Sequence, residues 1–315
     1  MTRAFARTLG LLLLSCALLP GPARAEADPP APAGGDYLGE AACRSCHLVE
    51  AEHWDDTLHA AVFQKNPRNA LERRSCEACH GPGRRHLEDP QDRARILAFT
   101  RESGHPVEVQ NASCLQCHAG GARLHWPGSA HEAVDVGCSD CHNPMTRSSE
   151  RGLLREATVH ETCFGCHPAQ RAEFRKRSHM PLFEGAISCT DCHQPHGSVA
   201  DPLLAADELN ALCYRCHADK RGPFLWEHAP VSESCLHCHR PHGSNRESLL
   251  SSPLPFLCQQ CHSQRGFGDH PTLPMRSANL GSGAAPDDRL LNRSCVNCHS
   301  RIHGSNHPAG ARFHR

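Results

Sequence analysis

The sequence has few of the side chains from which a soluble protein normally builds its interior. Its 315 residues include 10 Phe, 3 Trp, 2 Tyr and 4 Met, so aromatic residues make up only 5% of the chain, and the mean hydropathy is −0.52. The hydrophobic fraction of 39% also counts 21 Cys, which leaves still fewer core-forming side chains. These shortages argue against a conventional apolar core, a bundle of membrane helices, a collagen-like repeat and a coiled coil.

Long hydrophobic runs are also missing. The longest run, residues 9–19, is shorter than the roughly 20 apolar residues that a membrane-spanning helix needs. Two arginines precede it and Ala-Arg-Ala follows it at 23–25, a combination that predicts a cleaved Sec signal peptide at 1–25 and export of the chain. The competing interpretation is a lipoprotein signal in which Cys16 carries the lipid.

Cysteine and histidine are what the sequence has in excess, with 21 and 26 copies. Apart from Cys16, every cysteine belongs to a Cys-x-x-Cys-His motif, and the motif occurs ten times. The paired cysteines are Cys43 and Cys46, Cys76 and Cys79, Cys114 and Cys117, Cys138 and Cys141, Cys163 and Cys166, Cys189 and Cys192, Cys213 and Cys216, Cys235 and Cys238, Cys258 and Cys261, and Cys295 and Cys298. The histidines that end the motifs are His47, His80, His118, His142, His167, His193, His217, His239, His262 and His299.

This motif is the attachment site of c-type haem. The two thiols form thioether bonds to the haem, and the adjacent histidine is the proximal ligand of the iron. Zinc ribbons do not require a histidine after every second cysteine, disulfide frameworks impose no fixed pentapeptide, and a thioredoxin-type pair would occur once. We therefore expect ten covalent haem c groups, which supply the missing core and without which the apoprotein does not fold.

Short helices around the haems are the expected secondary structure. Residues 51–63 and 168–178 follow motifs and predict helices of two or three turns, and residues 88–103 are a further candidate. Residues 280–286 are rich in glycine and alanine and predict a loop. No segment carries a strand signal.

The motifs form pairs that repeat, and each repeat carries further histidines. Motifs three, five and seven begin at Cys114, Cys163 and Cys213, and each is followed by an aromatic residue and then a histidine. Another histidine follows the second motif of most pairs. A six-coordinate haem iron needs a second axial ligand, and neutral imidazole is a common one. We therefore expect nine distal ligands: His59, His86, His131, His179, His196, His228, His242, His270 and His303.

The second pair departs from this pattern. Met145 stands where His196 and His242 stand in their own repeats. Methionine is a competent axial ligand that raises the haem potential, and Met145 is the proposed tenth distal ligand. His125 and His105 are the alternatives, in which case Met145 only fills apolar space.

Several remaining histidines are weaker candidates. His160 ranks low because it aligns with Asn210 in the next repeat. His237, His307 and His314 are expected not to bind iron.

Four stretches make the sequence resemble a known family, the MtrA/DmsE group of periplasmic decahaem c-type cytochromes. They are residues 76–86, 213–228, 235–244 and 295–308, and the similarity runs over nearly all of the exported chain. The resemblance implies an elongated multihaem protein, mainly irregular with short helices and little or no β-structure. It implies two pentahaem halves, at 26–185 and 186–315. The nine distal histidines carry over from the family, and Met145 departs from a uniform set of histidine pairs.

The resemblance also implies partners and a place in the cell. Such proteins sit inside an outer-membrane β-barrel and receive or deliver electrons through a periplasmic or inner-membrane cytochrome. An extracellular multihaem cytochrome or reductase is a further possible partner, in metal reduction, iron oxidation or sulfoxide respiration. A formal net charge of −1 without a basic cluster gives no sign of a nucleic-acid partner.

The expected function is electron conduction without a substrate site. The alternative is a multihaem reductase with an open iron position, acting on a small nitrogen or sulfur oxyanion. Ten proximal and at least nine distal ligands leave one vacancy at most, and no motif ends in lysine. A membrane-anchored quinol oxidase subunit is a third interpretation. Such a subunit needs an anchor helix, and we expect none once the signal peptide is removed.

Overall fold

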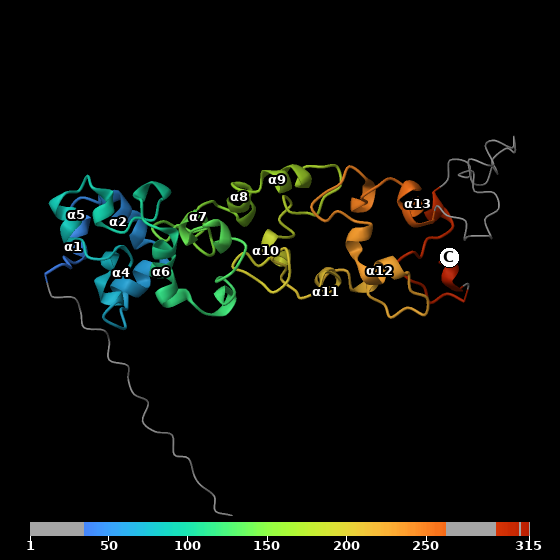
Figure 1. Cartoon of the computed structure of the whole chain (residues 1–315), viewed down its shortest axis with the longest axis horizontal. Helices are drawn as coiled ribbons and strands as arrows, with labels where there is room; N and C mark the ends of the chain where they lie inside the picture. Colours follow the sequence, from blue (N-terminus) through green and yellow to red (C-terminus); the bar gives the residue numbers. More distant parts are fainter. Residues whose placement is uncertain (1–34, 263–293, 309, 315) are drawn as a thin grey trace, which may run out of the picture.

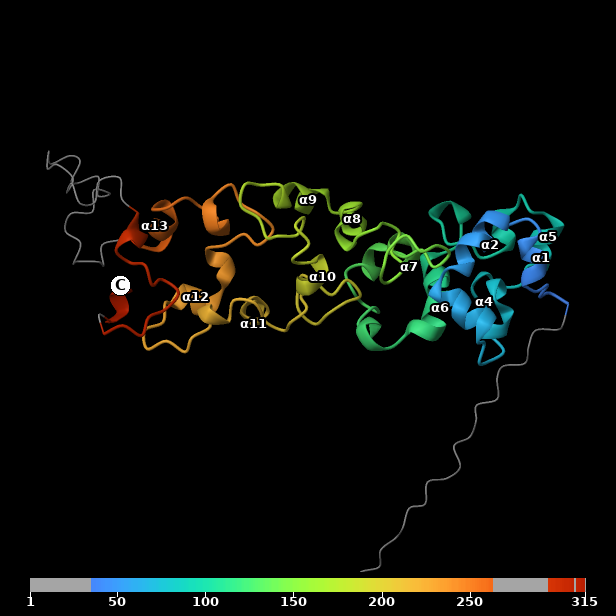
Figure 2. The same cartoon turned by 180° about the vertical axis from the view of Figure 1, so that it is seen from behind.

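The chain forms a long rod, and the order of segments along the rod follows their order in the sequence. The computed structural model describes residues 35–262, 294–308 and 310–314. Figure 1 and the reverse view in Figure 2 show the N-terminal helices at one end and the last motifs at the other. The expected elongated, mainly irregular fold with short helices is confirmed.

The helices are short and cluster in the N-terminal third. In that third they are α1 (Glu40–Arg44), α2 (Leu48–Asp55), α3 (Leu58–Ala60), α4 (Cys76–His80), α5 (Arg84–Glu88) and α6 (Val107–His118). The remaining helices are α7 (Cys138–Cys141), α8 (Val159–Phe164), α9 (Pro168–Phe174), α10 (Cys189–Cys192), α11 (Leu209–Tyr214), α12 (Ala229–Glu233) and α13 (Phe256–His262). The described residues form no sheet, only isolated bridges between pairs of residues, and they include no helix long and apolar enough to cross a membrane.

Several helices begin at a cap and end in a haem motif. Thr158 and Glu161 form a capping box at the start of α8, and Ser188 and Asp191 do the same for α10. Such reciprocal bonds satisfy amide groups that a first turn would leave unpaired. In α10 the two cysteines of the motif are three residues apart on one helical turn, so that both side chains face the same side.

The helix predictions meet three different outcomes. Residues 51–63 are helical, but as α2, α3 and a π-turn (Ala61–Lys65). α9 starts at Pro168 as expected and ends four residues early, at Phe174. The helix expected at 88–103 is wrong: only two 3-10 turns form there, Arg93–Arg95 and Arg101–Ser103. Leu280–Pro286 lies outside the described residues.

The failed helix has a physical cause. Between its two turns the backbone is extended, with Ile96 at φ −143° and ψ 145°. This conformation lets Leu97 form two bonds with His80: its amide donates to the His80 carbonyl at 3.1 Å, and its own carbonyl accepts from the His80 ring at 2.8 Å. A helix would have consumed both groups of Leu97 internally.

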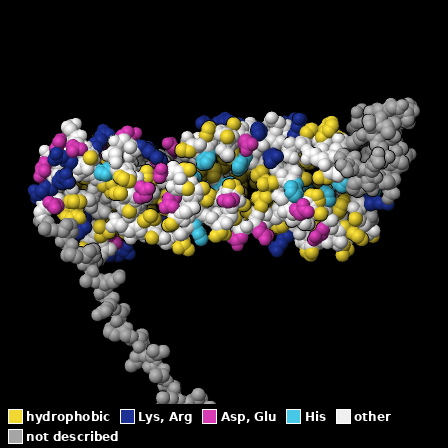
Figure 3. All heavy atoms as spheres, in the orientation of Figure 1, with side chains coloured by type: hydrophobic (Ala, Val, Ile, Leu, Met, Phe, Trp, Pro, Cys, Tyr) yellow, Lys and Arg dark blue, Asp and Glu magenta, His cyan; other side chains and the backbone are white. Residues whose placement is uncertain are grey.

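Apolar packing between side chains is sparse. The one cluster of buried hydrophobic residues among the described ones joins Phe164, Phe174 and Leu182. Elsewhere large apolar side chains are left exposed, and Figure 3 shows hydrophobic and histidine side chains at the surface along the rod. The interior of the C-terminal two thirds is instead a cavity of about 3160 Å³.

Candidate haem-binding sites

The large cavity is lined by the predicted haem-binding residues. Its wall contains residues from all six of the last motifs, including their six histidines, together with leucine, phenylalanine and proline side chains. Ordinary ligand pockets measure roughly 300–1,000 Å³, so this volume suits several large apolar groups in a row. The donor set and the space both fit covalent haem.

The first cysteines of the two motifs in a pair are neighbours in the interior. In all five pairs the thiol of the odd motif is close enough to the thiol of the even motif for its pKa to be affected. The pairs are Cys43 with Cys76, Cys114 with Cys138, Cys163 with Cys189, Cys213 with Cys235, and Cys258 with Cys295. Because haem attaches at these sulfurs, the two motifs of a pair would hold their haems next to each other.

The second cysteines connect one pair to the next. Burial raises the pKa of Cys79 to about 11, and the neighbouring Cys117 thiol adds to the effect. The same proximity joins Cys141 to Cys166, Cys192 to Cys216, and Cys238 to Cys261. These thiols become thioethers on haem attachment and then no longer titrate. What remains informative is that their sulfur atoms are neighbours. Together the neighbouring thiols link the motifs in order from the first to the tenth.

Seven of the predicted proximal histidines face a predicted distal histidine at a constant distance. The ring centres are 6.0–6.2 Å apart in the pairs His47–His86, His118–His59, His142–His196, His167–His131, His193–His242, His239–His303 and His262–His228. A metal held between two imidazole nitrogens, with bonds of about 2 Å each, places ring centres roughly 6 Å apart. The spacing therefore fits one iron between the members of each pair.

The pairs follow a rule that the sequence did not reveal. A histidine after an odd motif reaches forward to the proximal histidine two motifs ahead, as His131 reaches His167. A histidine after an even motif reaches back by two motifs, as His242 reaches His193. The exception is at the N-terminal end, where His86 pairs with the first motif, at His47. Every repeat thus lends ligands to its neighbours.

Backbone carbonyls orient the proximal histidines of the even motifs. The Nδ1 atoms of His142, His193 and His239 lie 2.6, 3.0 and 2.8 Å from carbonyl oxygens nine or ten residues further along. A hydrogen bond from Nδ1–H to a carbonyl leaves Nε2 as the free donor atom for a metal. His80 and His299 make the same kind of contact with Leu97 and Arg312.

The residues that supply these carbonyls were missed in the sequence. In three repeats the carbonyl belongs to the residue just before a Leu-Leu pair, at Leu153, Leu203 and Leu249. The first leucine of each pair has a positive φ of 49° to 58°, and its carbonyl accepts a 2.7 Å bond from the residue after the motif. The recurring Leu-Leu is the signal that could have identified this loop.

Neighbouring repeats cross at the His-Gly-Ser sequences. A Cβ on Gly243 would lie 2.0 Å from the Glu173 carbonyl oxygen, and one on Gly197 would lie 1.9 Å from that of His125. Both glycines also have a positive φ, at 158° and 108°. Only a residue without a Cβ lets the two backbones approach this closely.

Burial keeps several distal imidazoles in the form that binds metal. It lowers the pKa of His59, His196, His228 and His303 below the ordinary value for histidine, and nearby histidines add to the effect. A neutral imidazole has the free lone pair that a metal requires.

The remaining candidates are placed as follows. His179 is not opposite a proximal histidine; its ring contacts Glu184 and the Lys176 carbonyl. Nε2 of His105 is held by the Ile96 carbonyl at 2.9 Å, and His160 packs on Phe164 and Phe183.

Met145, the predicted tenth ligand, shows no axial-type contact within the part of the chain that the structure describes. Met145 is half-buried, and its amide donates to Asn143 at 3.1 Å. The ring centres of His314 and His299 are 4.6 Å apart, which is too close for an iron between the rings. His270 lies outside the described residues.

Comparisons with known proteins agree with this geometry. A family model for the doubled CXXCH motif matches residues 131–172, 179–222 and 228–267, and the model for cytochrome c554 and c-prime matches residues 87–143. The chain is 42% identical over 288 residues to the multiheme cytochrome MtrA of Shewanella baltica (strain OS185), covering 90% of this chain and 84% of that protein. The protein is therefore a member of the MtrA family of multihaem c-type cytochromes, an electron carrier with haem c bound covalently at its ten motifs.

Proposed function

We propose that the chain is a periplasmic, outer-membrane-associated wire that conducts electrons along ten haems and across the outer membrane. The ordered series of neighbouring thiols from the first motif to the tenth carries this proposal. Because haem follows haem along a rod, the two ends of the molecule serve as entry and exit for electrons. The haems carry the redox chemistry, while the protein sets their spacing, ligation and exposure.

The ligand set supports conduction rather than catalysis. Seven irons would have histidine on both faces, at the seven pairs with 6.0–6.2 Å spacing. Such an iron has no open position for a substrate and keeps its coordination when its oxidation state changes. By the backward rule, Met145, which follows the fourth motif, would serve the second haem opposite His80. The proposed reductase activity would need an open iron among the remaining three.

The proposed partner is an outer-membrane β-barrel. A rod built of loops leaves many backbone groups that need water or protein partners, so it cannot cross lipid unprotected. The polar lumen of a barrel would supply that protection. Electrons would enter from a periplasmic or inner-membrane cytochrome and leave to an extracellular multihaem cytochrome or reductase, or travel the other way. Export would depend on the signal peptide at 1–25.

The two halves at 26–185 and 186–315 are proposed as a division of haem number only. The cluster of Phe164, Phe174 and Leu182 packs on Ile187 and Cys189 and so spans the division. The haem chain would then continue across the division at residue 185, with no hinge between the two halves.

Reconstitution tests the wire. Lipid vesicles that enclose reduced methyl viologen are given the holoprotein together with its barrel partner, and ferric citrate is added outside. We expect oxidation of the enclosed viologen only when both proteins are present. Equal rates with the barrel alone would contradict the proposal. Carbon monoxide binding to the reduced holoprotein distinguishes the wire from the reductase. Binding of one carbon monoxide per protein, together with turnover of nitrite or a sulfur oxyanion, would favour the reductase.

A further inference from the structure

The segment after the fifth motif breaks the forward rule of the ligand pairs. His131 and His228 each face a proximal histidine two motifs ahead, at ring distances of 6.2 Å. By the same rule the segment after motif five should serve the haem of Cys213, Cys216 and His217. His179 was the distal ligand expected in this segment.

His179 is turned away from that haem site. Its Nδ1 lies 2.8 Å from the Lys176 carbonyl oxygen, and its Nε2 lies 3.2 Å from the Glu184 carboxylate. Both ring nitrogens are thus used within the same segment. His131 and His228 instead place Nδ1 on carbonyls of the crossing repeat, those of Pro195 and Ile302, at 2.8 and 3.0 Å.

The backbone register explains why His179 is excluded. At the crossing that positions His228, Trp226 is bridged to Ser305, the serine of a His-Gly-Ser sequence. At the equivalent crossing Ser178 is bridged to Ser244, with N–O distances of 2.9 and 2.7 Å. The ligand His228 is two residues beyond its bridge, and the residue two beyond Ser178 is Met180. Side chains alternate along an extended backbone, so His179 faces the opposite side.

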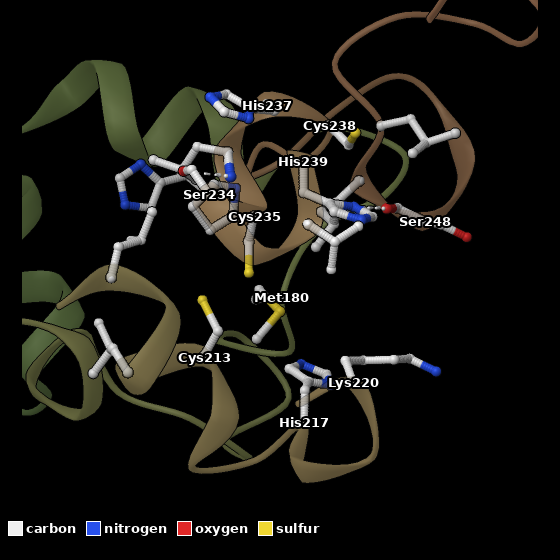
Figure 4. A pocket seen from close by; sticks show the side chains of 18 of the residues that line it. Met180, Cys213, His217, Lys220, Ser234, Cys235, His237, Cys238, His239 and Ser248 are labelled. Carbon is white, nitrogen blue, oxygen red and sulfur yellow. Dashed lines mark hydrogen bonds between the residues drawn. The ribbon is translucent and has the colours of Figure 1, made fainter. Parts of the chain in front are cut away.

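Met180 occupies the interior position that the register assigns to it. It lines the cavity and packs against the cluster of Phe164, Phe174 and Leu182. Figure 4 shows its thioether pointing into the cavity that the Cys213 thiol and the His217 ring also enter.

We propose that Sδ of Met180, and not a nitrogen of His179, is the second axial ligand of the seventh haem, opposite His217. Methionine opposite histidine raises the potential of a c-type haem relative to a pair of histidines. The seventh haem would then be a high-potential site in the C-terminal part of the wire. His179 and Glu184 form a surface ion pair.

Spectroscopy of the ferric holoprotein tests this ligand without relying on activity. Near-infrared magnetic circular dichroism separates methionine–histidine from bis-histidine haem, and it is read in a Met145→His background so that position 145 cannot contribute the methionine signal. We expect that signal in the background protein and its complete loss in the added Met180→His variant, with a lower potential for one haem in ten. Met180→Ala should instead open one haem in ten to carbon monoxide.

The matched control is His179→Ala, which removes the neighbouring candidate. It should leave the spectrum, the potentials and carbon monoxide binding unchanged. The proposal is overturned if His179→Ala opens a haem to carbon monoxide. It is also overturned if the Met145→His background has no methionine signal, or if the signal survives in Met180→His. The histidine variant retains a ligand and a side chain of similar length, so it answers the question even if Met180→Ala fails to fold.

Discussion

The N-terminal region that carries the first three motifs and the repeats that follow it build their interiors differently. Between residues 35 and 118 the chain has six helices, and Trp54, Ala60 and Glu77 are buried within it. Between residues 119 and 251 its helices have at most seven residues, and the interior is largely the cavity lined by the haem-binding residues. The first region buries side chains among its helices. The second region buries the cluster of Phe164, Phe174 and Leu182, and the rest of its interior is a cavity that fits haem. The same motif therefore supports two levels of dependence on its cofactor.

Removing a haem should separate the two regions most strongly. The double substitution Cys163→Ala with Cys166→Ala deletes a haem from the repeat region and would leave part of the large cavity unfilled. We expect a loss of at least roughly 5 kcal/mol in unfolding free energy, the upper end for large core truncations, measured by denaturant unfolding of the holoprotein. The same change at Cys43 and Cys46 should cost less. Equal losses would remove the contrast between the regions.

A buried carboxylate is the expected weak point of the first region. The Glu77 oxygens accept bonds from the backbone amides of Leu38, Gly39 and Gly83 at 2.8–3.2 Å. Glu77→Gln replaces one oxygen with an NH₂ group that faces a donor, which should cost about 2–3 kcal/mol. Thermal unfolding and proteolysis near residue 38 measure the effect. Glu247→Gln, at a side chain that is 84% exposed, is the control, and an equal effect there would refute the assignment.

A crossing glycine is the corresponding weak point of the repeats. In Gly243→Ala the new methyl would lie 2.0 Å from the Glu173 carbonyl oxygen, so the two repeats must separate at a cost of roughly 1–3 kcal/mol. Gly120→Ala, which meets nothing within 4 Å, should be nearly neutral. Denaturant unfolding compares the two variants. If Gly243→Ala leaves stability unchanged, the two backbones are further apart at this crossing than the structure places them.

The smallest expected effect distinguishes one repeat from its neighbours. His242 has its Nδ1 3.2 Å from the Glu173 carboxylate, whereas His131 and His228 contact neutral carbonyls. A carboxylate makes the imidazole a stronger donor, so Glu173→Gln should raise the potential of the sixth haem and leave stability unchanged. Spectroelectrochemical titration measures it. Glu184→Gln, beside His179, should shift no haem; a shift would place His179 on an iron.

The site residues differ in how far the sequence could identify them. Attachment cysteines and proximal histidines lie within five residues of one another, so a local pattern specifies them. Distal ligands come from other repeats, and for them repetition identified candidates without their destinations. His179 was chosen because it follows Phe174 at the same spacing as His131 follows Trp126. A one-residue shift in backbone register reverses which side chain faces the interior, and spacing within one segment carries no sign of that shift.

The sequence by itself determined the cofactor and its number, because attachment chemistry depends on a local pentapeptide. Its composition predicted that haem serves as the core. It also indicated short helices, since Gly and Pro punctuate the chain. The tertiary structure alone decided the forward and backward exchange of ligands, the extended segment at Ile96 and the inward position of Met180. Each of these depends on contacts between segments far apart in the chain, where backbone register and close approach at glycine, rather than local propensity, select the conformation.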